Sequence, residues 1–258
     1  MLATKQGHTE AADMLIRAGA NLDLHDFRGY SALMWASRSG HTEAAGKLIA
    51  AGAKLDLQNV GGNSALIGGG NSSLIVASQN GHTEATGKLI AAGAELDVQN
   101  VDGFSALMLA SQHGHTETVG KLIAAGAKPD LQNVYGFSAL MLASQNGHTE
   151  TVGKLIAAGA ELDLQSRRGF LQNVDGFSAL MLASQNGHTQ TVGKRIAAGA
   201  ELNLQSTVDF SALVWASESG NTEAAGKLIA AGAKLDLQGG LLMLVMLAAA
   251  YGRSATAT

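Results

Sequence analysis

The stretch GFSALMLASQNGHTETVGKLIAAGAELDLQ, residues 136–165, decides the fold because the chain repeats it. Nearly the same letters occupy residues 103–132 and 176–205. The glycine of the GHTE-like tetrad recurs at intervals of 33, 41, 33, 33, 40 and 33 residues. A fixed period of this length indicates a solenoid, in which each repeat packs only on its neighbours.

Two of these intervals exceed the base period, by eight and by seven residues. Both extra lengths fall where one repeat connects to the next, near residues 61–71 and 165–172. A loop takes up added residues at about 0.6 kcal/mol per doubling of its length. We therefore expect a single solenoid over residues 1–258, with two lengthened loops.

Each repeat predicts two short helices followed by an extended loop. In the repeat that starts at residue 103, Ser105 is a good N-cap for a first helix, which His113-Gly114 should end. Thr116 is predicted to cap a second helix, which Gly126 should close. Neither helix buries its apolar face alone, so stacked repeats must share one core.

Composition excludes several classes of protein. Apolar residues make up 46% of the chain and charged residues 15%, which is typical of a folded domain. A net charge of -4 argues against a nucleic-acid partner, because phosphates need clustered Lys and Arg. The longest apolar run, residues 241–250, is too short for a membrane span, which needs about 20 residues. The N-terminus lacks the pattern of a signal peptide, so we expect the cytoplasm, with the nucleus as the alternative.

The repeated words resemble the ankyrin-repeat family, whose 33-residue unit contains T-P-L-H, then G-H-x-E, then L-L-x-x-G-A. The matching words in one repeat are Ser105-Ala106-Leu107-Met108, Gly114-His115-Thr116-Glu117, Leu122-Ile123 and Gly126-Ala127. The resemblance covers almost the whole chain, as six full repeats between two half-repeats. It implies an all-α ankyrin solenoid of stacked helix-turn-helix units with hairpin-like loops.

Several residues depart from the family pattern. Gly120, Gly153 and Gly193 stand inside second helices, where each costs up to about 1 kcal/mol against alanine. Arg195 replaces a leucine that the other repeats carry at a core-facing position. Because burying an unpaired charge is costly, we expect the Arg195 side chain to bend outward to water. A local contact with an anion or a partner is the alternative.

The histidines and serines of the repeats do not predict chemistry. Six histidines recur once per repeat and should form a widely spaced row at the turns, whereas metal ligands must converge on one ion. A Ser/His/Asp set recurs in several repeats, and nothing marks one copy as active. We therefore expect no catalytic residue, no metal, no cofactor and no enzymatic activity.

The resemblance implies that a protein partner binds a concave surface formed by the hairpin tips and the first helices. Aromatic residues beside the tips are expected to form an outward row of binding residues, because exposed aromatics are favoured at interfaces. Packing of each ring on the neighbouring hairpin is the alternative. The candidate partner-binding residues are Arg28, Tyr30, Arg38, Asp102, Phe104, Gln112, Tyr135, Phe137, Gln145, Asp175, Phe177, Gln185, Phe210 and Glu218.

The chain begins and ends within a repeat, without clear capping units. This favours an alternative function, as a structural spacer or targeting segment of a larger multidomain protein, or as a truncated gene product without its own partner. The uncapped ends also suggest self-association, above all through residues 241–250. The main prediction remains a non-catalytic scaffold for protein–protein interaction.

Overall fold

The computed structural model describes residues 1–59, 69–167 and 176–235, which hold fourteen helices and no strand. The chain divides into two compact units, unit 1 with residues 1–134 and unit 2 with residues 135–258. Most of the two loops that were predicted to be lengthened, near residues 61–71 and 165–172, lies outside the described residues.

Each repeat contributes a first helix of up to seven residues and a second helix of nine. In unit 1 the helices are α1 (Leu2–Gln6), α2 (Thr9–Arg17), α3 (Ala32–Arg38), α4 (Thr42–Ala50), α5 (Ser73–Gln79), α6 (Thr83–Ala91), α7 (Ala106–Gln112) and α8 (Thr116–Ala124). In unit 2 they are α9 (Ala139–Gln145), α10 (Thr149–Ala157), α11 (Ala179–Gln185), α12 (Thr189–Ala197), α13 (Ala212–Glu218) and α14 (Thr222–Ala230).

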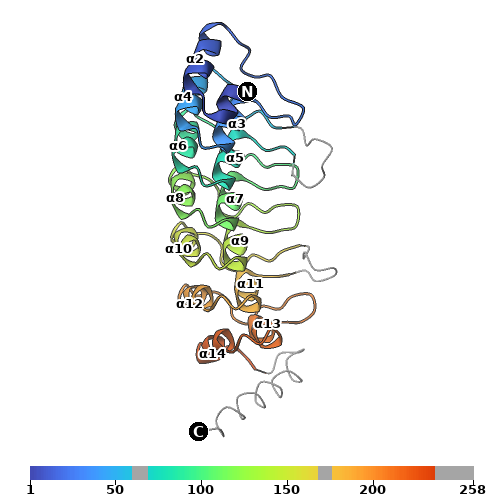
Figure 1. The fold of residues 1–258 in the computed structure, drawn as a ribbon. Helices are drawn as coiled ribbons and strands as arrows, with labels where there is room; N and C mark the ends of the chain where they lie inside the picture. Colours follow the sequence, from blue (N-terminus) through green and yellow to red (C-terminus); the bar gives the residue numbers. More distant parts are fainter. Residues whose placement is uncertain (60–68, 168–175, 236–258) are drawn as a thin grey trace. The chain divides into compact units, whose positions relative to one another are not determined.

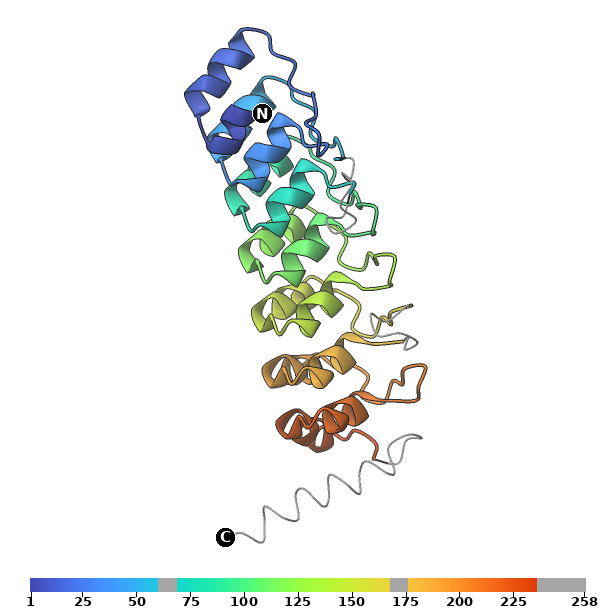
Figure 2. The ribbon, with the colours of Figure 1, turned by 45° about the vertical axis from the view of Figure 1, so that its right-hand side comes forward.

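The helices of each unit form two rows. In unit 1, α3, α5 and α7 follow one another in contact, and α2, α4, α6 and α8 form the second row beside them (Figure 1). The connecting loops of unit 1 leave on the side of the first helices, away from the second helices (Figure 2). Within each unit, this stacking confirms the predicted all-α repeat fold.

The helix ends follow from local chemistry. The Ser105 hydroxyl accepts a hydrogen bond from the Met108 amide at 3.3 Å, which confirms the predicted N-cap of the first helix. The second helix starts differently from the prediction. Thr116 is its first helical residue rather than its cap, and the Thr116 hydroxyl donates to the Gly114 carbonyl at 3.3 Å. Gly126 follows this helix with a φ of 97°, a left-handed conformation that suits glycine.

The tetrad histidine links one repeat to the next. In unit 1, His82 Nε2 donates to the Arg38 carbonyl at 2.9 Å, and His115 Nε2 donates to the Gln79 carbonyl at 3.1 Å. In unit 2, His188 Nε2 lies 2.9 Å from the Gln145 carbonyl. Each bond satisfies a carbonyl that the end of a first helix leaves unpaired. The histidines therefore stabilise the turns and also join the repeats.

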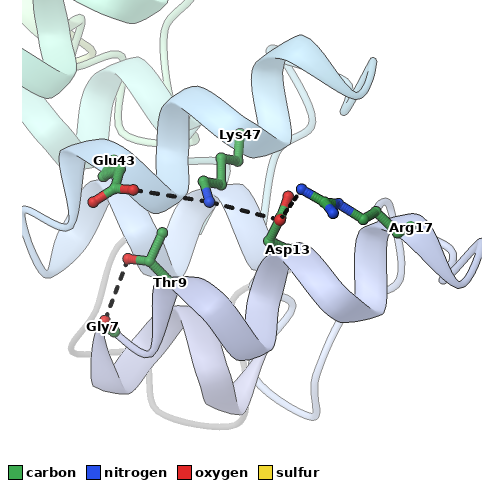
Figure 3. Close-up of polar contacts among 6 residues, drawn as sticks. All are labelled: Gly7, Thr9, Asp13, Arg17, Glu43 and Lys47. Carbon is green, nitrogen blue, oxygen red and sulfur yellow. Dashed lines mark hydrogen bonds and ion pairs between the residues drawn. The ribbon is translucent and has the colours of Figure 1, made fainter.

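The salt bridges of α2 and α4 lie at the surface of unit 1, and their side chains are partly or largely exposed. Asp13 of α2 pairs with Arg17 at 2.7 Å and with Lys47 of α4 at 3.8 Å, and Lys47 also reaches Glu43 at 3.8 Å (Figure 3). Exposed pairs of this kind contribute about 0–1 kcal/mol each. The array is held by packing between helices rather than by these charges.

Arg195 of α12 is fully buried, so the expectation that it bends outward is wrong. Its Nη2 donates to the Leu162 carbonyl, whereas Nε and Nη1 have no hydrogen-bond partner in the described part of the chain. Burial lowers the pKa of Arg195 to about 10, and the charge of Asp163 opposes this shift only in part. Seven of the eight other residues of α12 are identical to those of α10, so the helix places Arg195 against the core, where α10 has the buried Leu155.

The glycines inside the second helices are not all required by packing. A Cβ added to Gly87 of α6 would meet Lys121 Nζ at 3.5 Å, an ordinary contact. We expect Gly87→Ala to raise the free energy of unfolding by about 0.5–1 kcal/mol, because alanine favours the helix. Urea denaturation followed by circular dichroism measures the change.

Gly103 provides the contrasting variant for that experiment. Its φ is 78°, and an added Cβ would lie 2.7 Å from the Val134 backbone nitrogen in the next hairpin. Gly103→Ala is expected to lower the free energy of unfolding by more than about 1 kcal/mol. If Gly87→Ala and Gly103→Ala change the free energy of unfolding equally, the backbone conformation and contacts at the two glycines do not control stability.

The two tryptophans differ in how their ring nitrogens are satisfied. Trp35 Nε1 donates to Asp26 Oδ2 at 2.8 Å, and Asp26 Oδ1 accepts the Arg28 and Tyr30 amides at 2.9 Å each. Burial alone would raise the pKa of Asp26, but these hydrogen bonds outweigh it and lower the pKa. In unit 2, Ser206 stands at the position of Asp26, nine residues before Trp215. Among the described residues, neither the Ser206 hydroxyl nor Trp215 Nε1 has a hydrogen-bond partner.

We expect Ser206→Asp to stabilise unit 2 by about 1 kcal/mol, because it supplies the missing acceptor to a buried N–H. The added carboxylate acts in its charged form. The gain should therefore be present at pH 7 and shrink as the pH falls below about 4, where aspartate becomes protonated. Urea denaturation at pH 7 and at pH 3 measures both values, and a gain that is unchanged at pH 3 would contradict this explanation.

Candidate partner-binding cleft

The hairpin loop of residues 100–104 forms one wall of a cleft in unit 1. Asn100 Oδ1 accepts the Asp102 amide at 3.1 Å and the Phe104 amide at 2.8 Å, and the Asn100 amide returns to the Phe104 carbonyl at 3.0 Å. Asn100 Nδ2 donates to Asn71 Oδ1 at 2.9 Å, which ties this hairpin to the preceding one. The loop is therefore rigidly placed beside the first helices.

The C-terminal ends of α3, α5 and α7 form the other wall. The cleft has a volume of about 630 Å³. Most of its lining side chains are polar, and they come from three successive repeats. The lining residues are Arg38, Asn71, Gln79, Asn80, Asn100, Asp102, Phe104, Leu109, Gln112, His113 and His115.

Arg38 is exposed at one end of the cleft and is held in place by aromatic side chains. Its Nη1 donates to the Tyr30 hydroxyl at 2.8 Å, and its Cζ lies 5.6 Å from the Tyr30 ring centroid and 6.0 Å from that of Trp35. A guanidinium over an aromatic face is stabilised by the ring quadrupole. The charge is thus presented to solvent in one orientation before any ligand arrives.

Part of the polar lining is used by the fold itself. Asn80 Nδ2 donates to the Val76 carbonyl at 2.7 Å, and the Asn71 and Asn100 amides bind each other. In contrast, no hydrogen bond or ion pair is recorded for the side chains of Gln79 and Asp102 within the described ranges. Within the described residues Arg38 makes one side-chain hydrogen bond, which uses one of its five N–H donors.

A family model that describes three copies of the ankyrin repeat matches residues 1–67 and 74–166. The match covers more than half of the chain. The chain belongs to the ankyrin-repeat family. Ankyrin repeats are in general modules of protein–protein interaction, and the family is typically non-catalytic. A search among curated proteins finds no match.

The expected outward row of aromatics is wrong for three members of this ankyrin array. Tyr30, Phe137 and Phe177 are buried, with 4%, 1% and 3% of their surfaces exposed. Phe104 and Phe210 are half-buried. In unit 2 the Phe177 ring lies 4.9 Å from that of Trp215, and the Phe210 ring lies 5.1 Å from it. The rings pack within the fold, as the alternative interpretation expected.

The cleft brings together four of the predicted binding residues, Arg38, Asp102, Phe104 and Gln112. Arg28 is exposed and lies in a separate cleft of about 420 Å³ beside Phe27 and Trp35. Five candidates lie in unit 2 with at least part of their surface accessible: Tyr135, Gln145, Gln185, Phe210 and Glu218. Asp175 and the apolar run at residues 241–250 lie outside the described residues.

Sequence reasoning missed the structural role of Asn100 and the place of Leu109 and His115 in the cleft wall. Asn100 could have been found, because an Asn, Ser or Asp stands four residues before the aromatic in each of the five repeats that carry this aromatic. Within the described ranges, no cluster of three or more His, Cys, Asp or Glu could hold a metal ion. None of the helices in those ranges combines the length and the apolar character that crossing a bilayer requires.

Proposed function

We propose that this chain is a non-catalytic scaffold that binds a protein partner on the concave surface formed by hairpin loops and first helices, with the cleft of unit 1 as its main site. The observation that carries the proposal is the cleft itself, because it joins three repeats and its lining includes two charged side chains, Arg38 and Asp102, that form no ion pair in the described part of the chain. Extended concave surfaces are the usual binding surfaces of solenoids.

Most of the residues that line the cleft belong to first helices and hairpin loops. In unit 1 the second helices form a separate row, on the side of the first helices away from those loops (Figure 1). A partner in the cleft therefore should not depend on residues such as Glu117, which is exposed on α8. We also infer that both units belong to one array of repeats, because the 33-residue interval between Gly114 and Gly147 spans their boundary unchanged.

The test compares the purified chain with two charge-reversal variants in an affinity pull-down with quantitative mass spectrometry. Asp102→Lys should remove the proteins that the unsubstituted chain retains, and Glu117→Lys, its control on the outer surface, should leave them in place. Retention that is lost equally in both variants would contradict binding in the cleft. Retention of no protein by the unsubstituted chain would favour the spacer or the partnerless gene product.

A further inference from the structure

Arg38 is the only arginine at its position in the repeats. The next two repeats of unit 1 carry Gln79 and Gln112 there. The guanidinium is fixed by the Tyr30 hydroxyl and the two rings described above, and the structure records no ion pair between it and a carboxylate among the described residues. A planar guanidinium binds a carboxylate through two parallel hydrogen bonds, and holding it in place beforehand reduces the entropy lost on binding.

Asp102 carries the opposite charge in the same cleft. Its main chain is fixed, since its amide donates to Asn100 Oδ1 and its carbonyl accepts the Val134 amide at 3.1 Å. Its carboxylate is half-exposed and has no recorded partner in the described part of unit 1. The cleft thus holds one positive and one negative group, neither of which forms an ion pair within the described residues, and the surrounding hydrogen bonds fix the position of each.

The two charges are separated by two steps of the helix stack, because Arg38 ends α3 and Asp102 belongs to the hairpin that precedes α7. Packed helices lie about 8–10 Å apart, so two steps correspond to about 16–20 Å. An extended peptide rises about 3.3 Å per residue and covers this length with about five or six residues. The unpaired Gln79 amide between the two ends offers both a donor and an acceptor, which suits a peptide main chain.

We propose that the cleft of unit 1 binds an extended peptide segment with an acidic residue at Arg38 and a basic residue at Asp102, about five or six positions apart. This specificity rests on the proposed function and defines the chemistry of its partner. Nucleic acid is a poor occupant, because Arg38 is the only Lys or Arg among the described residues that line the cleft, and the chain has a net charge of -4.

Selection from a phage-displayed library of random twelve-residue peptides tests the specificity. The unsubstituted chain should enrich peptides that carry one acidic and one basic residue at a constant separation of about five or six. Arg38→Gln should enrich peptides without the acidic residue, and Asp102→Asn should enrich peptides without the basic one. Arg38→Gln inserts the residue that the next two repeats carry, and Asp102→Asn keeps the size of the side chain, so both should fold.

The synthetic form of the most enriched peptide should bind Arg38→Gln about ten-fold more weakly than the unsubstituted chain, as the loss of one charge-assisted pair predicts. Enriched peptides without this charge pattern, or a pattern that both variants leave unchanged, would overturn the specificity and leave the proposed function standing. If the unsubstituted chain enriches no peptide relative to the Asp102→Lys variant, both the peptide specificity and the proposed binding function are overturned.

Discussion

Replacing Arg195 with leucine is expected to raise the free energy of unfolding of unit 2 by about 3 kcal/mol. The guanidinium is fully buried, Nε and Nη1 have no hydrogen-bond partner among the described residues, and Nη2 donates to the Leu162 carbonyl. A pKa lowered by burial from the ordinary arginine value to about 10 corresponds to about 3 kcal/mol against the charged form. Leucine fits the site, because Leu155 is fully buried at the same position of the preceding repeat.

The lowered pKa of Arg195 determines how the gain in unfolding free energy from Arg195→Leu depends on pH. Below pH 9 the arginine is charged in both the folded and the unfolded chain, so the full penalty is present and the gain from Arg195→Leu should not vary with pH. As the pH rises through about 10, the folded state loses its proton first and the penalty declines. The measurement is urea denaturation at pH 7 and at pH 9.

Arg17→Leu is the matched control, since it removes the same charge from an exposed side chain paired only with Asp13. That variant should change the free energy of unfolding by less than about 1 kcal/mol. If Arg195→Leu is neutral or destabilising, the guanidinium is not an unpaired buried charge and our description of α12 is wrong.

The second large effect is expected at the aromatic side chains. Phe177→Ala should lower the free energy of unfolding by about 3–5 kcal/mol, the usual range for a buried phenylalanine. The ring is 3% exposed and packs against Trp215 with centroids 4.9 Å apart, and such pairs add about 0.5–1.5 kcal/mol to the burial of their area. Urea denaturation followed by tryptophan fluorescence measures the loss.

Phe27→Ala is the control for this variant, because Phe27 is 88% exposed. We expect it to change stability by less than about 0.5 kcal/mol. If Phe177→Ala is as mild as the control, the ring is not part of the core and its role as a binding residue must be reconsidered.

The fold was predictable from the sequence because the same words recur and every copy repeats the same helix signals. Ser105, Gly114 and Gly126 determine the helix ends through local backbone and side-chain conformation, so the sequence of one repeat was sufficient to predict those ends. The burial of Phe177 was not predictable in this way, since it depends on Trp215 of the following repeat. The prediction that the Arg195 side chain bends outward was wrong for a related reason. The neighbouring helices bury this side chain completely, which the pattern of a single amphipathic helix does not show.

The cleft was predictable only in part. The repeat predicts which residues end the first helices, and two of these, Arg38 and Gln112, line the cleft. The sequence did not show which polar side chains remain available to bind a partner. Asn80 and Asn100 are engaged in hydrogen bonds that form only in the folded chain. The residues that differ from the repeat are therefore the best candidates for specificity.

The most direct test of the central claim is site-specific photo-cross-linking. A photoreactive benzoyl-phenylalanine is placed either at Gln79, inside the cleft of unit 1, or at Glu117, exposed on α8. After irradiation with a cell extract, mass spectrometry compares the proteins attached at the two positions. We expect one defined set of proteins attached at Gln79, removed by Asp102→Lys, and absent at Glu117. The same proteins attached equally at both positions, or only at Glu117, would contradict a scaffold that binds its partner in the cleft.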